Sequence, residues 1–80
     1  MAVYIYIWKS NEDEAFVHYS FSPEDGVVGV MRIARATGNM DLLQPCPGDD
    51  TFTYYQCACK AVWNGWSVKK LPETTQYIYG

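Results

Sequence analysis

One stretch, residues 49–66, constrains the fold more than any other part of this 80-residue chain. Asp49 and Asp50 are typical of a helix start, because a carboxylate there accepts backbone N–H bonds and faces the positive end of the helix dipole. Gly65 predicts the helix end, because glycine readily adopts a positive φ. Between these signals, apolar side chains recur at the three- and four-residue spacing of one helix face: Phe52, Tyr55, Ala58, Cys59, Val62 and Trp66. The pattern therefore predicts an amphipathic helix with one buried face.

The rest of the chain has the pattern of β-strands. Val3, Ile5 and Ile7 alternate with Tyr4, Tyr6 and Trp8, which predicts a strand with an aliphatic face and an aromatic face. Turn-rich segments at 9–14, 22–26 and 37–39 separate this strand from three more, at 15–21, 27–36 and 40–44, and a closing strand is expected at 74–79. Short connections favour antiparallel neighbours. The prediction is an α+β fold: an antiparallel four- to five-stranded meander sheet, with one amphipathic helix packed on the aliphatic face.

Size and composition predict a single domain, residues 1–80. The chain is 49% hydrophobic and 16% aromatic, which is enough for a small core because large rings bury much area per residue. No apolar run is long enough to span a membrane, and Ala2 to Trp8 lacks the basic start and cleavage site of a secretory signal.

The cysteines predict reduced thiols rather than a disulfide framework or a metal site. Their number is odd, and Cys57 and Cys59 would point about 200° apart on a helix. With Cys46 and His18 they include the ligand types of a zinc site, but no Cys-x-x-Cys spacing is present. Free thiols favour a cytoplasmic location. We expect no metal and no cofactor.

Catalytic motifs are not apparent. His18 is the only histidine and has no Ser-His-Asp or Cys-His spacing around it, so a structural histidine on a strand is the favoured interpretation over a general base. The sequence contains no Gly-rich phosphate loop. We therefore expect a protein that is not an enzyme and has no catalytic residues.

Charge is unevenly distributed. Residues 1–50 carry eight acidic and three basic side chains, and the chain has a net charge of −3. Direct nucleic-acid binding is disfavoured, because that affinity comes mainly from neutralising phosphates. An acidic surface suits a basic protein partner instead.

Two groups of residues are candidates for binding that partner. Interfaces favour Tyr and Trp, which points to the aromatic face of the first strand, and two acidic loops offer a docking surface. Both features have alternatives, because the rings can pack beneath a second layer and the acidic loops can be solvated turns. The predicted partner-binding residues are Tyr6, Trp8, Glu12, Asp13, Glu14, Glu24 and Asp25.

A family resemblance covers about residues 26–79. Residues 26–45 read as a strand, a Thr-Gly turn and a second strand; Pro47-Gly48-Asp49-Asp50 then opens an aromatic, alanine-containing helix, and Leu71-Pro72-Glu73 precedes a Tyr-rich tail. This arrangement resembles small cytosolic immunity proteins of bacterial polymorphic-toxin and contact-dependent growth inhibition systems.

The resemblance implies an antitoxin that binds a cognate toxin domain, often a basic nuclease, and occludes its active site stoichiometrically. The alternative is a small protein- or ligand-binding module without catalytic activity. A ligand-binding module would show a deep pocket, and an enzyme would show a convergent cluster around His18.

Overall fold

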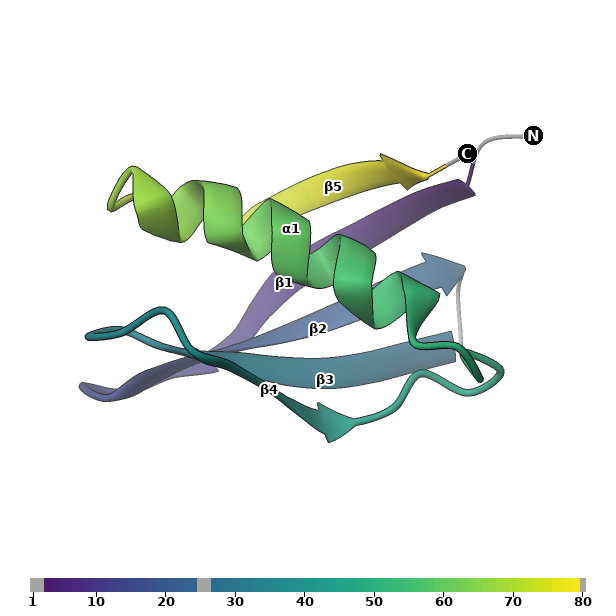
Figure 1. The fold of residues 1–80 in the computed structure, drawn as a ribbon, viewed down its shortest axis with the longest axis horizontal. Helices are drawn as coiled ribbons and strands as arrows, with labels where there is room; N and C mark the ends of the chain where they lie inside the picture. Colours follow the sequence, from purple (N-terminus) through teal and green to yellow (C-terminus); the bar gives the residue numbers. More distant parts are fainter. Residues whose placement is uncertain (1–2, 25–26, 80) are drawn as a thin grey trace.

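The fold is a five-stranded antiparallel sheet with one helix packed on one face, seen here in a computed structural model that describes residues 3–24 and 27–79 (Figure 1). The elements are β1 (Val3–Glu12), β2 (Phe16–Glu24), β3 (Val27–Ala34), β4 (Met40–Gln44), α1 (Thr53–Ser67) and β5 (Thr74–Tyr79). The strand order is β4-β3-β2-β1-β5. The predicted α+β fold and its sheet are confirmed.

The helix carries the chain from one edge of the sheet to the other. Strands β1 to β4 form a meander, which leaves β4 at one edge. The chain then crosses the sheet through α1, and β5 pairs with β1 from Val3 opposite Tyr79 to Trp8 opposite Thr74 (Figure 1). The first and last strands are therefore neighbours, and β5 becomes the second edge of the sheet.

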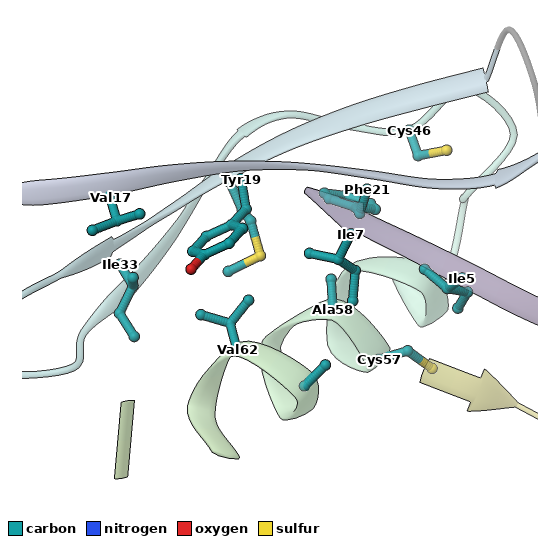
Figure 2. Close-up of a cluster of buried hydrophobic side chains, with 12 residues drawn as sticks. Ile5, Ile7, Val17, Tyr19, Phe21, Ile33, Cys46, Cys57, Ala58 and Val62 are labelled. Atoms are coloured by element: carbon teal, nitrogen blue, oxygen red, sulfur yellow. The ribbon is translucent and has the colours of Figure 1, made fainter. Parts of the chain in front are cut away.

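The core lies between the sheet and α1. Figure 2 shows the sheet side chains pointing toward the helix, where Ala58 and Val62 face them. Small residues such as Ala58 and Ala61 allow a helix to approach a sheet closely, while the sheet supplies the large side chains. The fully buried side chains of the sheet are Ile5, Ile7, Val17, Tyr19, Phe21, Met31 and Ile33. The prediction that the aliphatic face of the first strand meets the helix is confirmed.

The start of α1 differs from the prediction. The helix begins at Thr53 rather than Asp49, and Phe52 before it has a φ of 58° and is 46% exposed. The prediction that Phe52 belongs to the buried helix face was wrong, because the chain bends at this residue. The bend brings the buried Asp49 over the helix end, where its carboxylate accepts the backbone N–H groups of Tyr54 at 3.2 Å and Tyr55 at 3.1 Å. Asp49 therefore caps the helix, as predicted.

The end of α1 also differs. Gly65 lies inside the helix, which continues to Ser67, and Lys69 is the residue with a positive φ, at 58°. The prediction that Gly65 ends the helix was wrong. A Cβ atom at this position would lie 2.8 Å from Pro72 Cδ and 2.9 Å from the Lys70 carbonyl oxygen. Glycine is required here because the returning chain crosses the helix at close range.

Two strands are longer than predicted. β1 continues to Glu12, and β2 continues to Glu24 through a segment that was predicted to be a loop. Ser22 pairs with Tyr6, and Glu24 pairs with Val27 across an irregularity in the ladder. The tight turn between β3 and β4 has the positive φ expected at Gly38, 78°.

Tyr19 connects the middle of the sheet to the segment that leads into β5. Its side chain is fully buried, and its hydroxyl donates a 2.7 Å hydrogen bond to the Pro72 carbonyl oxygen. Burial, with a smaller contribution from the negative charge of Glu73, raises the pKa of Tyr19 to about 12. This hydrogen bond helps to position β5 against β1.

Candidate protein-binding face

The sheet has an open face, the side away from α1, where the aromatic residues of β1 lie. Tyr4 and Tyr6 are 47% and 53% exposed, and Ile78, directly opposite Tyr4 on β5, is 60% exposed. Trp8 is half-buried on the same face. Within residues 3–24 and 27–79, no second layer covers these side chains. The structure therefore brings Tyr6 and Trp8 together with Tyr4, which belongs to the predicted aromatic face but was not among the predicted binding residues. It also adds Ile78, which the prediction did not include.

Two serines lie beside the aromatic residues on the open face. Ser22 is directly opposite Tyr6, and Ser20 is directly opposite Trp8. Both serines are buried although no helix lies above them, with 5% and 7% of their surfaces exposed. Short side chains on a sheet are buried in this way when taller neighbours lean over them. Tyr6 and Trp8 therefore each lie directly beside a buried serine of β2.

The far end of the open face is polar. Arg32 places its guanidinium carbon 4.1 Å from the centroid of the Phe16 ring and donates from Nε to Asp41 at 3.0 Å. These two contacts combine a cation–π interaction with an ion pair across β2, β3 and β4. Strand alternation in the sequence could have placed Arg32 on the open face, because Arg32 shares the period-two spacing of the residues on that face.

His18 lies on this face between Arg32 on β3 and Asn11 on β1. Its Nδ1 atom is buried and has no hydrogen-bond partner among the described residues. Neither directly opposite neighbour can take a proton from a histidine or orient it as a carboxylate would. The described residues also contain no group of three or more His, Cys, Asp or Glu side chains placed to hold a metal ion.

The acidic residues of the β1–β2 hairpin are mostly engaged by neighbouring groups. Glu12 forms ion pairs with Arg35 and, at 3.5 Å, with Lys9. Asp13 accepts the backbone N–H groups of Phe16 and Ala15, each at 2.8 Å. The hydrogen bond from Arg35 lowers the pKa of Glu12, with a further contribution from Lys9.

The neighbouring carboxylate, Asp13, also has a lowered pKa. The backbone hydrogen bond from Phe16, followed by the one from Ala15, lowers the pKa of Asp13. The next residue, Glu14, is exposed. Asp13 therefore shapes the hairpin turn, whereas Glu14 is the predicted acidic residue of this turn that makes no hydrogen bond or ion pair with the described residues.

The two acidic segments do not form one surface. Glu12 to Glu14 lie at the end of β1 and in the turn before β2, while Glu24 is the last residue of β2, and Asp25 lies outside the described residues. A nine-residue strand is roughly 30 Å long. The predicted docking surface is therefore divided between opposite ends of the sheet, with the aromatic residues between them.

A basic depression of about 260 Å³ lies at the hairpin end of the molecule, and sequence reasoning missed it. Its lining residues are far apart in the chain and are brought together by the hairpin and the end of α1: Lys9, Arg35, Trp66, Lys69 and Leu71. Lys9 and Arg35 are already neutralised by Glu12, and Lys9 also contacts Glu73 at 3.3 Å. Lys69 is exposed and supplies the additional positive charge.

A second depression, of about 400 Å³, lies at the other end of the sheet, and Pro23, Val27 and Tyr54 are among its lining residues. The three cysteines, by contrast, form no disulfide and contribute to neither depression.

In the described part of the chain, the 15-residue α1 is the one helix, and it is neither long nor apolar enough to cross a membrane. No family model matches this chain, and no curated protein or solved structure is significantly similar to it.

Proposed function

We propose that this chain is an immunity protein that acts in the cytoplasm by binding a cognate bacterial toxin domain. It inhibits by stoichiometric occlusion of the toxin's active site and catalyses no reaction. The observation that carries this proposal is the open face, on which Tyr4, Tyr6 and Ile78 are each about half exposed on adjacent strands.

This arrangement is favourable for tight protein binding for two physical reasons. Tyrosine and tryptophan combine a large apolar area with a polar end, and they are enriched among the residues that carry most of the energy of protein interfaces. These residues also lie on paired strands of a sheet, so little conformational freedom is lost when a partner binds. A rigid aromatic surface with no cofactor chemistry suits an inhibitor better than it suits a catalyst.

The acidic balance of the chain supports a basic partner, such as a nuclease domain. The electrostatic attraction of a basic partner toward this chain depends on the summed field of all its charges. That field persists even where individual carboxylates such as Glu12 are paired. Glu14, which is exposed at the hairpin tip, is the acidic residue best placed to act on the association rate without affecting the fold.

The proposal is tested by protecting cells from the toxin domain that is encoded beside the gene for this chain. Co-expression of the wild-type chain should restore growth, and Tyr6→Ala should reduce this protection. Phe52→Ala is the matched control, because Phe52 is a 46% exposed aromatic residue at the start of the helix, away from the open face. Equal protection by both variants, or a neighbouring gene that encodes no toxin, would overturn the proposal.

A second candidate is a module that binds a small anionic ligand in the basic depression. The observation that favours it is the exposed Lys69, which lines the depression together with the Trp66 ring and adds positive charge to the paired Lys9 and Arg35. The two functions are distinguished by Lys69→Ala, which should weaken ligand binding in the depression but leave protection against a toxin unchanged.

A further inference from the structure

The outer edge of β5 lacks the features that normally protect an edge strand. β5 is the last strand of the sheet order, and no strand in the described ranges pairs with its outer side. Its sequence, Thr-Thr-Gln-Tyr-Ile-Tyr, contains no charged residue, no proline and no glycine. It follows β1 in continuous register over six residue pairs. Natural edge strands usually carry a charge, a proline or a bulge, because an unprotected edge is a template for another strand.

The opposite edge of the sheet is protected. β4 is only five residues long, carries Asp41, and is followed directly by Pro45. Its register with β3 shifts between Val30 and Met31, which interrupts the ladder. Each of these features opposes the addition of a further strand. The molecule therefore has one edge suited to pairing.

One hydrogen bond establishes which backbone groups of β5 face outward. The Lys9 N–H donates to the Glu73 carbonyl oxygen at 2.7 Å, in the same register as the β1–β5 ladder. Hydrogen-bonded pairs alternate along an antiparallel ladder, so Thr75 and Tyr77 also direct their backbone groups toward β1. The residues between them, Thr74, Gln76 and Ile78, direct theirs to the outer edge.

We propose that β5 pairs with the β5 strand of a second copy of this chain, in an antiparallel register centred on Gln76. In this register Gln76 lies opposite Gln76 of the second copy, and Thr74 lies opposite Ile78. The outward N–H and C=O groups of all three residues are then hydrogen-bonded, in both copies. The interface is isologous and closes on itself as a two-fold dimer.

The charge distribution makes the β5 edge the least repulsive place for two copies to meet. Each chain carries a net charge of −3, so two copies repel one another at most approaches. Pairing through β5 brings together two strands without any charge. A second copy presents the same uncharged strand, so no charged side chain of either β5 strand enters this register.

The dimer would join two five-stranded sheets into one continuous sheet, with both helices on the same side. The two open faces would then form one surface, because directly opposite residues share a face of the sheet. This inference concerns self-association and is independent of the toxin-binding role.

The test uses the purified full chain and measures its mass in solution by light scattering and sedimentation over a wide concentration range. The wild type should shift from the 9.1 kDa monomer to twice that mass as concentration rises. Gln76→Lys and Gln76→Glu should each weaken dimerisation by roughly tenfold or more, because the two-fold axis places identical charges directly opposite each other. Mixing the two variants should restore the dimer, because the pair is then of opposite charge.

Gln56→Lys is the matched control, since it makes the same substitution at an exposed position on α1 and should leave the dimer unchanged. Hydrogen exchange gives an independent readout of the register. The Gln76 and Ile78 amides should gain protection as concentration rises, whereas the Thr75 and Tyr77 amides should be protected at every concentration. A wild type that stays monomeric at high concentration, a dimer unaffected by either Gln76 variant, or variants that do not recover on mixing would each overturn the proposal.

Discussion

Replacing Tyr19 with phenylalanine removes a single oxygen atom from the centre of the structure. The Tyr19 hydroxyl is fully buried and donates to the Pro72 carbonyl oxygen at 2.7 Å, so Tyr19→Phe leaves that carbonyl without this donor. Losing a buried hydrogen-bond partner costs about 1–3 kcal/mol. We expect a loss of about 1–2 kcal/mol in the free energy of unfolding, because the ring itself remains and no large cavity forms.

The assay is urea denaturation followed by circular dichroism and tryptophan fluorescence. Tyr4→Phe is the control, because Tyr4 is 47% exposed and loses its hydroxyl from the protein surface. Its unfolding free energy should stay within about 0.5 kcal/mol of the wild type. If Tyr19→Phe were as stable as Tyr4→Phe, the hydrogen bond to Pro72 would not hold the segment before β5, and the reasoning would be wrong.

Alkaline pH provides a second readout of the same hydroxyl. The pKa of Tyr19 is about 12 in the folded state, against an ordinary value of 10.0. The contribution of the Tyr19 hydroxyl to stability is fully present below pH 10 and is lost as pH rises toward about 12. The reason is that Tyr19 loses its phenolic proton at a lower pH in the unfolded chain than in the folded protein. The stability difference between the wild type and Tyr19→Phe should therefore narrow over this interval.

Three further predictions concern a glycine, a turn and the thiols. Gly65→Ala should destabilise the protein in urea melts, because the added Cβ would meet Pro72. This is expected although alanine is a better helix former than glycine by about 1 kcal/mol. A more stable variant would contradict the close approach of Pro72 to the helix. Asp13→Ala should lower the melting temperature more than Glu14→Ala does. The difference should be present above pH 3.8 and disappear as pH falls below it, since hydrogen bonds lower the pKa of Asp13; melting curves at several pH values test this. All three thiols should react with a thiol reagent in urea and at most slowly in the native protein. Fewer than three reactive thiols after unfolding would contradict the reduced state of the cysteines.

The period of the apolar residues was sufficient to predict the architecture. Alternation in residues 3–8 and helical spacing in residues 52–66 carry the information that distinguishes strand from helix, and short turns between strands favour antiparallel neighbours. The same information could not predict the helix ends. Phe52 has the spacing of the buried face but lies at a backbone bend. Gly65 is a residue type typical of a helix end, but it is required inside the helix because the chain folds back and brings Pro72 against it.

The candidate site was predictable in part. Strand alternation identified Tyr4, Tyr6 and Trp8 as one face, and the structure adds Ile78 through the position of β5. Sequence proximity suggested that the acidic residues act together, but a strand separates Glu14 from Glu24. Positions that depend on which strands are neighbours, such as those lining the basic depression, cannot be derived from local patterns.

The most direct test of the binding role is to map the contact surface by nuclear magnetic resonance. The isotopically labelled chain is titrated with the toxin domain encoded beside its gene, and the backbone amide shifts are followed. We predict that the shifts saturate at an equimolar ratio and are largest at Tyr4, Tyr6 and Trp8, with little change at Gln56 and Lys60 on the outer side of the helix. Large shifts confined to the helix, or no saturable shifts at all, would contradict binding through the open face.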